Sequence, residues 1–250
     1  MSILDFFAPS GKLPPTGAFS LAHLIMSAIS FAAVAIAISF SRRLDHKKIK
    51  GIVRSLSVLL CLLEIAKIVF NLLTGHASDP NSYFPLYFCS ITLYAGLLAS
   101  FAKGWWNRTG EVFLATGGLI GGICYVIYPL TSVTVYPPFH FITLHSFFLH
   151  SAMVYVGLLI IITGYTKIKP SDIDHHFFLV TIVSVIAFTV NIFFHTNLMF
   201  LSQNYPGTFL EVLYNIFPGL IFPLFMYLAQ ATLPFYIVYL GYWGFTKNRK

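Results

Sequence analysis

Residues 19–40 read FSLAHLIMSAISFAAVAIAISF, and residues 41–54, directly after them, read SRRLDHKKIKGIVR. The first stretch is apolar over the length that a helix needs to cross the hydrocarbon layer, about 20 residues. The second stretch is basic, and basic residues collect on the cytoplasmic side of membrane helices. Because the basic run follows the apolar stretch and none precedes it, we expect no cleaved signal peptide. The two stretches together predict a membrane span that ends in the cytoplasm.

The composition of the whole chain is also that of a membrane protein. Of 250 residues, 57% are hydrophobic and 9% are charged, whereas charged residues make up about a quarter of a soluble domain. The net charge is +7, but every Lys and Arg except Lys12 and Lys67 lies just beyond the end of an apolar stretch. That placement is typical of membrane topology rather than of a phosphate-binding face, so we expect no nucleic-acid partner.

Apolar stretches recur along the chain and predict an all-α, single-domain bundle of seven transmembrane helices over residues 1–250. The predicted spans are 19–40, 52–73, 84–102, 111–128, 139–165, 176–195 and 222–245. The apolar run over 209–245 is too long for one span and too short for two. Pro218 and Pro223 divide it, so we expect a short interfacial helix over 209–217 before the last span.

The distribution of basic residues predicts the orientation. With the amino terminus outside, the cytoplasmic segments are 41–54, 102–110, 166–175 and 246–250. These segments hold Arg42, Arg43, Lys47, Lys48, Lys50, Arg54, Lys103, Arg108, Lys167, Lys169, Lys247, Arg249 and Lys250, and the outer segments hold only Lys12. We therefore predict a multi-pass protein of the cell membrane with a cytoplasmic carboxyl terminus.

The fourth predicted span is rich in glycine. Gly117, Gly118, Gly121 and Gly122 form two overlaid patterns of small residues four apart, which let helix backbones approach closely in lipid. A seam within the monomer is the favoured interpretation, and a homodimer face is the alternative.

Ionisable groups at membrane depth are costly and tend to mark function. At about 1.5 Å of rise per residue, Cys89 lies roughly 8 Å below the outer surface, His145 roughly 9 Å and His150 roughly 16 Å. Glu64 and Lys67 lie in the same outer half, three residues apart on one helical face, where they can pair. His23 begins the first span on the outer side, and His195 ends the sixth span there.

Structural explanations compete with functional ones for these residues. Glu64 and Lys67 are explained equally well as a pair whose charges neutralise each other. For His23 and His195 the favoured interpretation is an interfacial position in contact with water. Cys61 and Cys124 are interpreted as packing residues. His145 and His150 are about 140° apart around a helix, so we do not expect both to point at one site.

Other chemistries lack their sequence patterns. The adjacent His175 and His176 are interpreted as an interfacial cap after Pro170, and no other close His, Cys or Glu spacing suits a metal. The chain has no phosphate-binding loop, dinucleotide fingerprint or serine-hydrolase elbow. We expect neither a metal nor a cofactor.

Three stretches carry a family resemblance: FPLYFCSITLY (84–94), HSFFLHSAMVYVG (145–157) and NIFFHTNLMFLSQNYPGTFLEVLYNIFPG (191–219). Together they resemble the bacterial YwaF-type integral membrane family, which opens its third helix with Pro-Leu-x-x-Cys and places a His in an aromatic fifth helix. The sequence departs from that family at Leu198, where a Tyr is expected, and at the segment NIFPG. This family in turn resembles eukaryotic transmembrane acyltransferases that remodel ether phospholipids and, more distantly, membrane hydrolases of fatty-acid esters of hydroxy fatty acids, so the resemblance implies either acyl transfer or ester hydrolysis.

The resemblance implies a nucleophile and a base inside the bilayer that act on phospholipid acyl esters. The matching positions are Cys89 as the nucleophile and His150 as the base, with His145 as the alternative base. A set of polar residues at similar depth is expected to line the pocket or bind substrate: His23, Glu64, Lys67, Asn191, His195 and Asn197. Candidate oxyanion donors are Ser90, Thr92, Asn191 and Asn197.

Two other functions remain as alternatives. In a transporter or small-solute binding protein, the same polar groups would line the solute path, but then polar residues are expected in both membrane halves, and no inverted repeat is evident. In a scaffold without chemistry, Cys89 and the histidines would point apart.

Overall fold

Helices make up all the regular structure of residues 3–75, 79–129 and 131–247, the parts of the chain that the computed structural model describes. Six helical stretches there are long and apolar enough to cross a membrane. Four are single helices, α2 (Leu21–Ser41), α3 (His46–Leu73), α7 (Phe141–Thr163) and α10 (Ile221–Lys247). The other two are Gly104–Ile127 and Pro170–Phe194. The protein is therefore a multi-pass membrane protein, as predicted.

The two composite stretches contain short irregular turns. Gly104–Ile127 joins α5 (Gly104–Phe113), the π-helix η3 (Leu114–Gly118) and α6 (Leu119–Ile127), and Pro170–Phe194 joins the 3-10 turn η4 (Pro170–Asp172) to α8 (Ile173–Phe194). The remaining elements are α1 (Ile3–Phe6), η1 (Pro80–Ser82), η5 (Leu198–Phe200) and α9 (Phe209–Ile216). The last of these confirms the short helix predicted over 209–217.

The predicted third span, 84–102, is the largest departure from expectation. In its place the chain forms a shorter apolar helix, Phe88–Phe101, made of η2 (Phe88–Ser90) and α4 (Ile91–Phe101). Pro85 has no backbone N–H to donate and disfavours helix at the residue before it, and residues 84–86 are not helical. Most of α4 is buried inside the bundle. The described residues thus hold six long spans and one short internal helix rather than seven equivalent spans.

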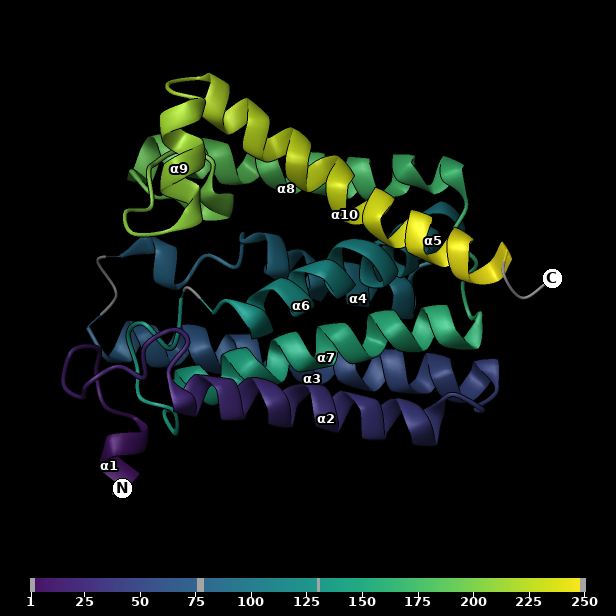
Figure 1. The fold of residues 1–250 in the computed structure, drawn as a ribbon, viewed down its shortest axis with the longest axis horizontal. Helices are drawn as coiled ribbons and strands as arrows, with labels where there is room; N and C mark the ends of the chain where they lie inside the picture. Colours follow the sequence, from purple (N-terminus) through teal and green to yellow (C-terminus); the bar gives the residue numbers. More distant parts are fainter. Residues whose placement is uncertain (1–2, 76–78, 130, 248–250) are drawn as a thin grey trace.

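The helices run alternately in opposite directions, so each end of the bundle collects a particular set of connections (Figure 1). One end holds the N-terminal segment, η1, the loop between α6 and α7, and α9. The opposite end holds the turns that follow α2, α4 and α7, together with the C-terminal end of α10. These turns and the helix ends beside them carry most of the basic residues, so this second end is called the basic end.

Two arginine side chains join neighbouring helices at the basic end. The Arg108 guanidinium binds the Asp172 carboxylate, with its Nε donating at 3.0 Å and an Nη at 2.5 Å, and it also donates to the Lys167 carbonyl at 2.6 Å. Arg54 donates to the Ser100 carbonyl at 3.0 Å, where a cation complements the C-terminal end of α4. Arg54 and Arg108, two of the basic residues that predict the topology, therefore also join α3 to α4 and α5 to η4.

Burial distinguishes central helices from lipid-facing ones. In the apolar window of Gly104–Ile127, 67% of residues are buried, against 17% in α2 and 22% in α3. In Figure 1, α4 and α6 lie between the layer of α2, α3 and α7 and the pair α8 and α10. The segment from α5 to α6 therefore forms the centre of the bundle.

The glycines of this central segment allow the close packing around it. A Cβ at Gly122 would lie 2.8 Å from the His150 carbonyl oxygen of α7, and one at Gly121 would lie 3.3 Å from the Phe88 ring. Gly117 and Gly118 are likewise buried against neighbours in the same chain. The pattern thus serves a seam within the monomer, and the homodimer stays a prediction.

Which end of the bundle faces the cytoplasm is tested by cysteine labelling. We expect Pro206→Cys, between η5 and α9, to react with a membrane-impermeant maleimide on intact cells, because that end carries few basic residues. Lys48→Cys at the basic end, where the native side chain is 67% exposed, should react only after permeabilisation. Both variants are made in a background in which the three native cysteines are alanine. The opposite labelling pattern would reverse the orientation.

Candidate active site

A cavity of about 870 Å³ opens at the end of the bundle opposite the basic end. Its walls come from α3, the segment from η1 to η2, α6, the start of α7, α9 and α10. This volume lies within the range of about 300–1,000 Å³ that is typical of ligand sites. Cys89, His145, His150, Glu64 and Lys67 all line it.

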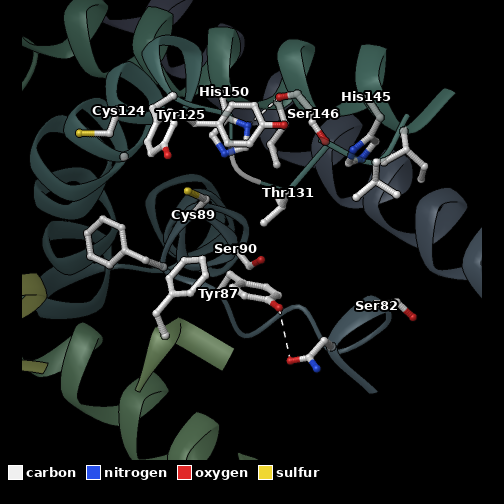
Figure 2. Close-up of a pocket in the computed structure, with 18 of the residues that line it drawn as sticks. Ser82, Tyr87, Cys89, Ser90, Cys124, Tyr125, Thr131, His145, Ser146 and His150 are labelled. Atoms are coloured by element: carbon white, nitrogen blue, oxygen red, sulfur yellow. Dashed lines mark hydrogen bonds between the residues drawn. The ribbon is translucent and has the colours of Figure 1, made fainter. Parts of the chain in front are cut away.

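Cys89 lies in η2, at the start of the short internal helix. Figure 2 shows its sulfur pointing toward the side of the cavity where Tyr125 and His150 lie. The side chain is half-buried and packs against a small cluster that includes Leu93 and Leu149. The helix break at Pro85 that shortens the predicted span thus places Cys89 on the wall of a cavity.

His150 is held in one tautomer by its own helix. Its Nδ1 lies 2.6 Å from the Ser146 carbonyl oxygen, which can only accept, so Nδ1 carries the proton of the neutral ring. The lone pair is therefore on Nε2. This atom is buried and has no hydrogen-bond partner among the residues that the structure describes. A neutral imidazole in this state is equipped to take a proton.

Tyr125 fixes the plane of the His150 ring. The two rings stack with centroids 3.5 Å apart and planes 10° apart. The Tyr125 hydroxyl is itself hydrogen-bonded to Ser132 Oγ in the loop after α6. The His150 ring is therefore oriented by Ser146 from α7 and by Tyr125 from α6.

A charged cluster forms a second polar region of the cavity. The Lys67 ammonium donates to Glu64 Oε1 at 2.5 Å, which confirms the predicted pairing on one face of α3. The other carboxylate oxygen, Oε2, lies 3.7 Å from His145 Nε2 on α7. Glu64 and His145 are both buried.

His145 and His150 point in different directions, as their spacing on the helix predicts, yet both line the cavity. The two rings do diverge around α7, with His145 beside Glu64 of α3 and His150 under Tyr125 of α6. The cavity reaches both because α3 and α6 pack on α7. One site therefore offers two histidines with different neighbours.

The remaining predicted pocket residues do not line the cavity. His23 is buried rather than in contact with water, accepting from the Phe19 N–H at 2.9 Å and pairing with the Val126 carbonyl at 3.2 Å. Asn191 is buried and holds η5 through the N–H and carbonyl of Leu198. These two residues join segments of the fold.

His195 and Asn197 lie in the turn that follows α8. His195 ends that helix in a left-handed conformation, with φ of 53°. The Asn197 side chain accepts from the backbone N–H groups of Ser202 and Gln203. Both residues stabilise the turn after α8, and neither lines the cavity.

His175 and His176 are not the simple interfacial cap that the sequence predicted. His176 is fully buried, pairs with Thr116 Oγ1 at 2.9 Å and with the Gln230 carbonyl at 3.2 Å, and stacks on Phe113. It thereby links α8, the π-helix and α10. His175 pairs with Thr109 Oγ1 at 2.9 Å.

Sequence reasoning missed several residues of the site. Tyr125, Ser146 and Tyr87 line the cavity, as does Cys124, for which the sequence predicts a packing role. Cys124 is exposed, and its sulfur points away from Cys89 and His150 (Figure 2). The depth comparison applied to ionisable groups would have found Tyr125 and Cys124, since both lie near the outer end of the fourth span. Within the described chain no three His, Cys, Asp or Glu side chains are grouped to hold a metal ion.

Comparisons with known proteins identify the family. No curated protein and no solved structure shows a significant match to the chain. The model of the TMEM164 family matches residues 18–243, a range that includes Cys89, both cavity histidines and nearly all of the apolar segments. The motifs quoted above resemble those of YwaF-type proteins, and the family model that matches is that of the TMEM164 family. The chain therefore belongs to the TMEM164 family of membrane proteins.

Proposed function

We propose that this protein is an intramembrane acyltransferase that moves an acyl chain from one phospholipid to another through a thioester on Cys89. The observation that carries the proposal is the wall shared by Cys89 and His150, where the buried Nε2 of His150 has a lone pair and no described partner. The resemblance of the motifs around both residues to ether-phospholipid acyltransferases agrees with this chemistry.

In the first half of the reaction, His150 Nε2 takes the proton of the Cys89 thiol as the sulfur attacks the ester carbonyl carbon. A C–S bond forms, the ester C–O bond breaks, and the proton passes from His150 to the departing lysophospholipid oxygen. A thiol needs such a base because the thiolate is the nucleophile. The stack with Tyr125 and the bond to Ser146 keep Nε2 oriented without help from substrate.

The cavity has an apolar wall and a polar wall, as a site for a phospholipid needs. α9 and α10 contribute apolar side chains such as Leu210 and Met226, which offer a surface for an acyl chain. α3 and η1 contribute polar ones, among them Lys67, Asn71 and Asn81, which can face a headgroup and glycerol. An ester bond lies between these two parts of a phospholipid.

The test is acyl transfer by the purified full chain in lipid nanodiscs. Phosphatidylcholine with an isotope-labelled acyl chain is the donor and lysophosphatidylethanolamine is the acceptor. We expect labelled phosphatidylethanolamine to accumulate, detected by mass spectrometry. Nanodiscs that contain no protein are the control. Absence of both transfer and free labelled fatty acid would refute the proposal and favour the binding or transport alternative.

A further inference from the structure

We propose that Glu64 and His145 form a second acid–base pair in the same cavity, which binds the hydroxyl of the acceptor lysophospholipid and takes its proton. This inference rests on the acylation of Cys89 proposed above. It assigns the second half of the reaction to residues that the first half does not use.

Unpartnered polar atoms point to a ligand at this position. By hydrogen-bond geometry, neither ring nitrogen of His145 nor Glu64 Oε2 has a partner among the described residues, although the Leu63 carbonyl lies close to the His145 ring. His145 is 5% exposed and Glu64 3% exposed. Buried polar atoms are almost always satisfied in folded proteins, because leaving them unpaired is costly. Three such atoms on one cavity wall indicate a place for a polar group of the substrate.

The contacts of Glu64 determine which ring nitrogen of His145 can take a proton from substrate. The Lys67 ammonium donates to Glu64 Oε1 at 2.5 Å, which leaves Oε2 as the carboxylate oxygen that is not engaged by Lys67. Glu64 Oε2 faces His145 Nε2 at 3.7 Å, a separation that can shorten to a hydrogen bond when substrate binds. A carboxylate there places the ring proton on Nε2, which leaves the lone pair on Nδ1 for an acceptor hydroxyl.

The positions of the two histidines separate their tasks. His150 lies against Tyr125, on the side of the cavity toward which the Cys89 sulfur points, whereas His145 lies apart from that stack along α7 (Figure 2). Acyl transfer uses two nucleophiles in turn, first a thiol and then a hydroxyl. A cavity with one imidazole near the thiol and a second beside a carboxylate provides a base for each.

The second half of the reaction then balances as follows. His145 Nδ1 takes the proton of the acceptor hydroxyl as its oxygen attacks the thioester carbonyl carbon. A C–O bond forms, the C–S bond breaks, and the proton returns from His145 to the Cys89 sulfur. The enzyme regains its thiol and both neutral histidines, and the product is a phospholipid.

The test separates formation of the thioester from its discharge. The purified full chain in nanodiscs is first loaded with labelled phosphatidylcholine, and lysophosphatidylethanolamine is then added, because discharge to lysophosphatidylcholine would only reverse the loading step. In Glu64→Gln and His145→Gln we expect loading to stay close to that of the native protein and discharge to slow by about 10²-fold or more. Hydroxylamine, a strong nucleophile that needs no base, should discharge the native and variant thioesters at equal rates.

Two further variants test whether slow discharge comes from a disturbed structure rather than from loss of the base. Glu64→Gln leaves Lys67 without its partner, so Glu64→Gln combined with Lys67→Met restores the charge balance and should still discharge slowly. Cys61→Ala, one turn away on α3 and outside the cavity lining, should load and discharge as the native protein does.

Three other outcomes would refute the inference, and the first two can be distinguished from failure of the proposed function. Normal discharge in both variants would refute it and leave acylation of Cys89 intact. Loss of loading in His145→Gln would assign that histidine to the first half-reaction instead. A native protein that forms no thioester would refute the proposed function itself, and the inference with it.

Discussion

Replacing Cys89 with alanine will abolish acyl transfer, with turnover falling on the order of 10⁴-fold or more, because removal of a covalent nucleophile leaves only binding and electrostatic assistance. The substitution removes one sulfur atom from a half-buried site on the cavity wall, so expression and thermal stability in detergent should change little. Transfer between labelled phosphatidylcholine and a lysophospholipid measures the effect.

Cys61→Ala is the matched control for this variant. Cys61 packs in the same small cluster as Cys89 but does not line the cavity, so its loss should leave turnover unchanged. Undiminished turnover in Cys89→Ala would remove the thioester mechanism and direct attention to another nucleophile in the cavity, with the exposed Cys124 first.

Replacing His150 with glutamine will slow formation of the thioester by about 10²–10⁴-fold, the usual contribution of a general base. Glutamine has no basic nitrogen, and it cannot reproduce the lone pair that the bond from Nδ1 to the Ser146 carbonyl leaves on Nε2. The rate of labelled adduct formation in a single turnover measures the loss directly.

His46→Gln is the control for histidine replacement in general, because His46 is exposed at the basic end. A His150→Gln protein that keeps its melting temperature and loads Cys89 at the native rate would show that His150 is not the base. His145 would then be the base for the thiol, and the division of tasks between the two histidines would be wrong.

Much of the fold could be predicted from the sequence because lipid imposes simple rules. Apolar stretches of spanning length and basic residues at their ends located the six long helices, and two prolines located the short helix predicted over 209–217. The third span was predicted too long because residues 84–87 are apolar without being helical. Hydropathy does not distinguish an apolar coil packed within a bundle from a helix in lipid, and Pro85 is the residue that separates the two here.

The start of α3 also differs from the predicted start of the second span. α3 begins at His46 rather than at residue 52, because Asp45 caps it by accepting from the Lys48 N–H at 2.9 Å. A capped helix continues into water, whereas hydropathy reports only the part in lipid. Such extensions position the basic end and leave the cavity unaffected.

The site was predictable where it depended on local spacing. Glu64 and Lys67 pair as residues three apart on a helix do. Cys89 and His150 line one cavity, having been matched by depth and by motif.

The site was unpredictable where it depended on which helices are neighbours. Nothing in the sequence shows that Tyr125 of α6 stacks on His150, or that His145 faces α3. For the same reason depth alone wrongly grouped His23 and Asn191 with the cavity, since a buried polar residue can equally well satisfy the backbone of a neighbouring segment.

The most direct test of the account is the mass of the native protein after brief exposure to phosphatidylcholine with a labelled acyl chain, quenched in acid and digested. The account predicts one labelled acyl group on the peptide that contains Cys89, removed by neutral hydroxylamine. Acyl transfer that proceeds with no acyl group on Cys89, or with the label on Cys61, Cys124 or a hydroxyl side chain, would contradict it.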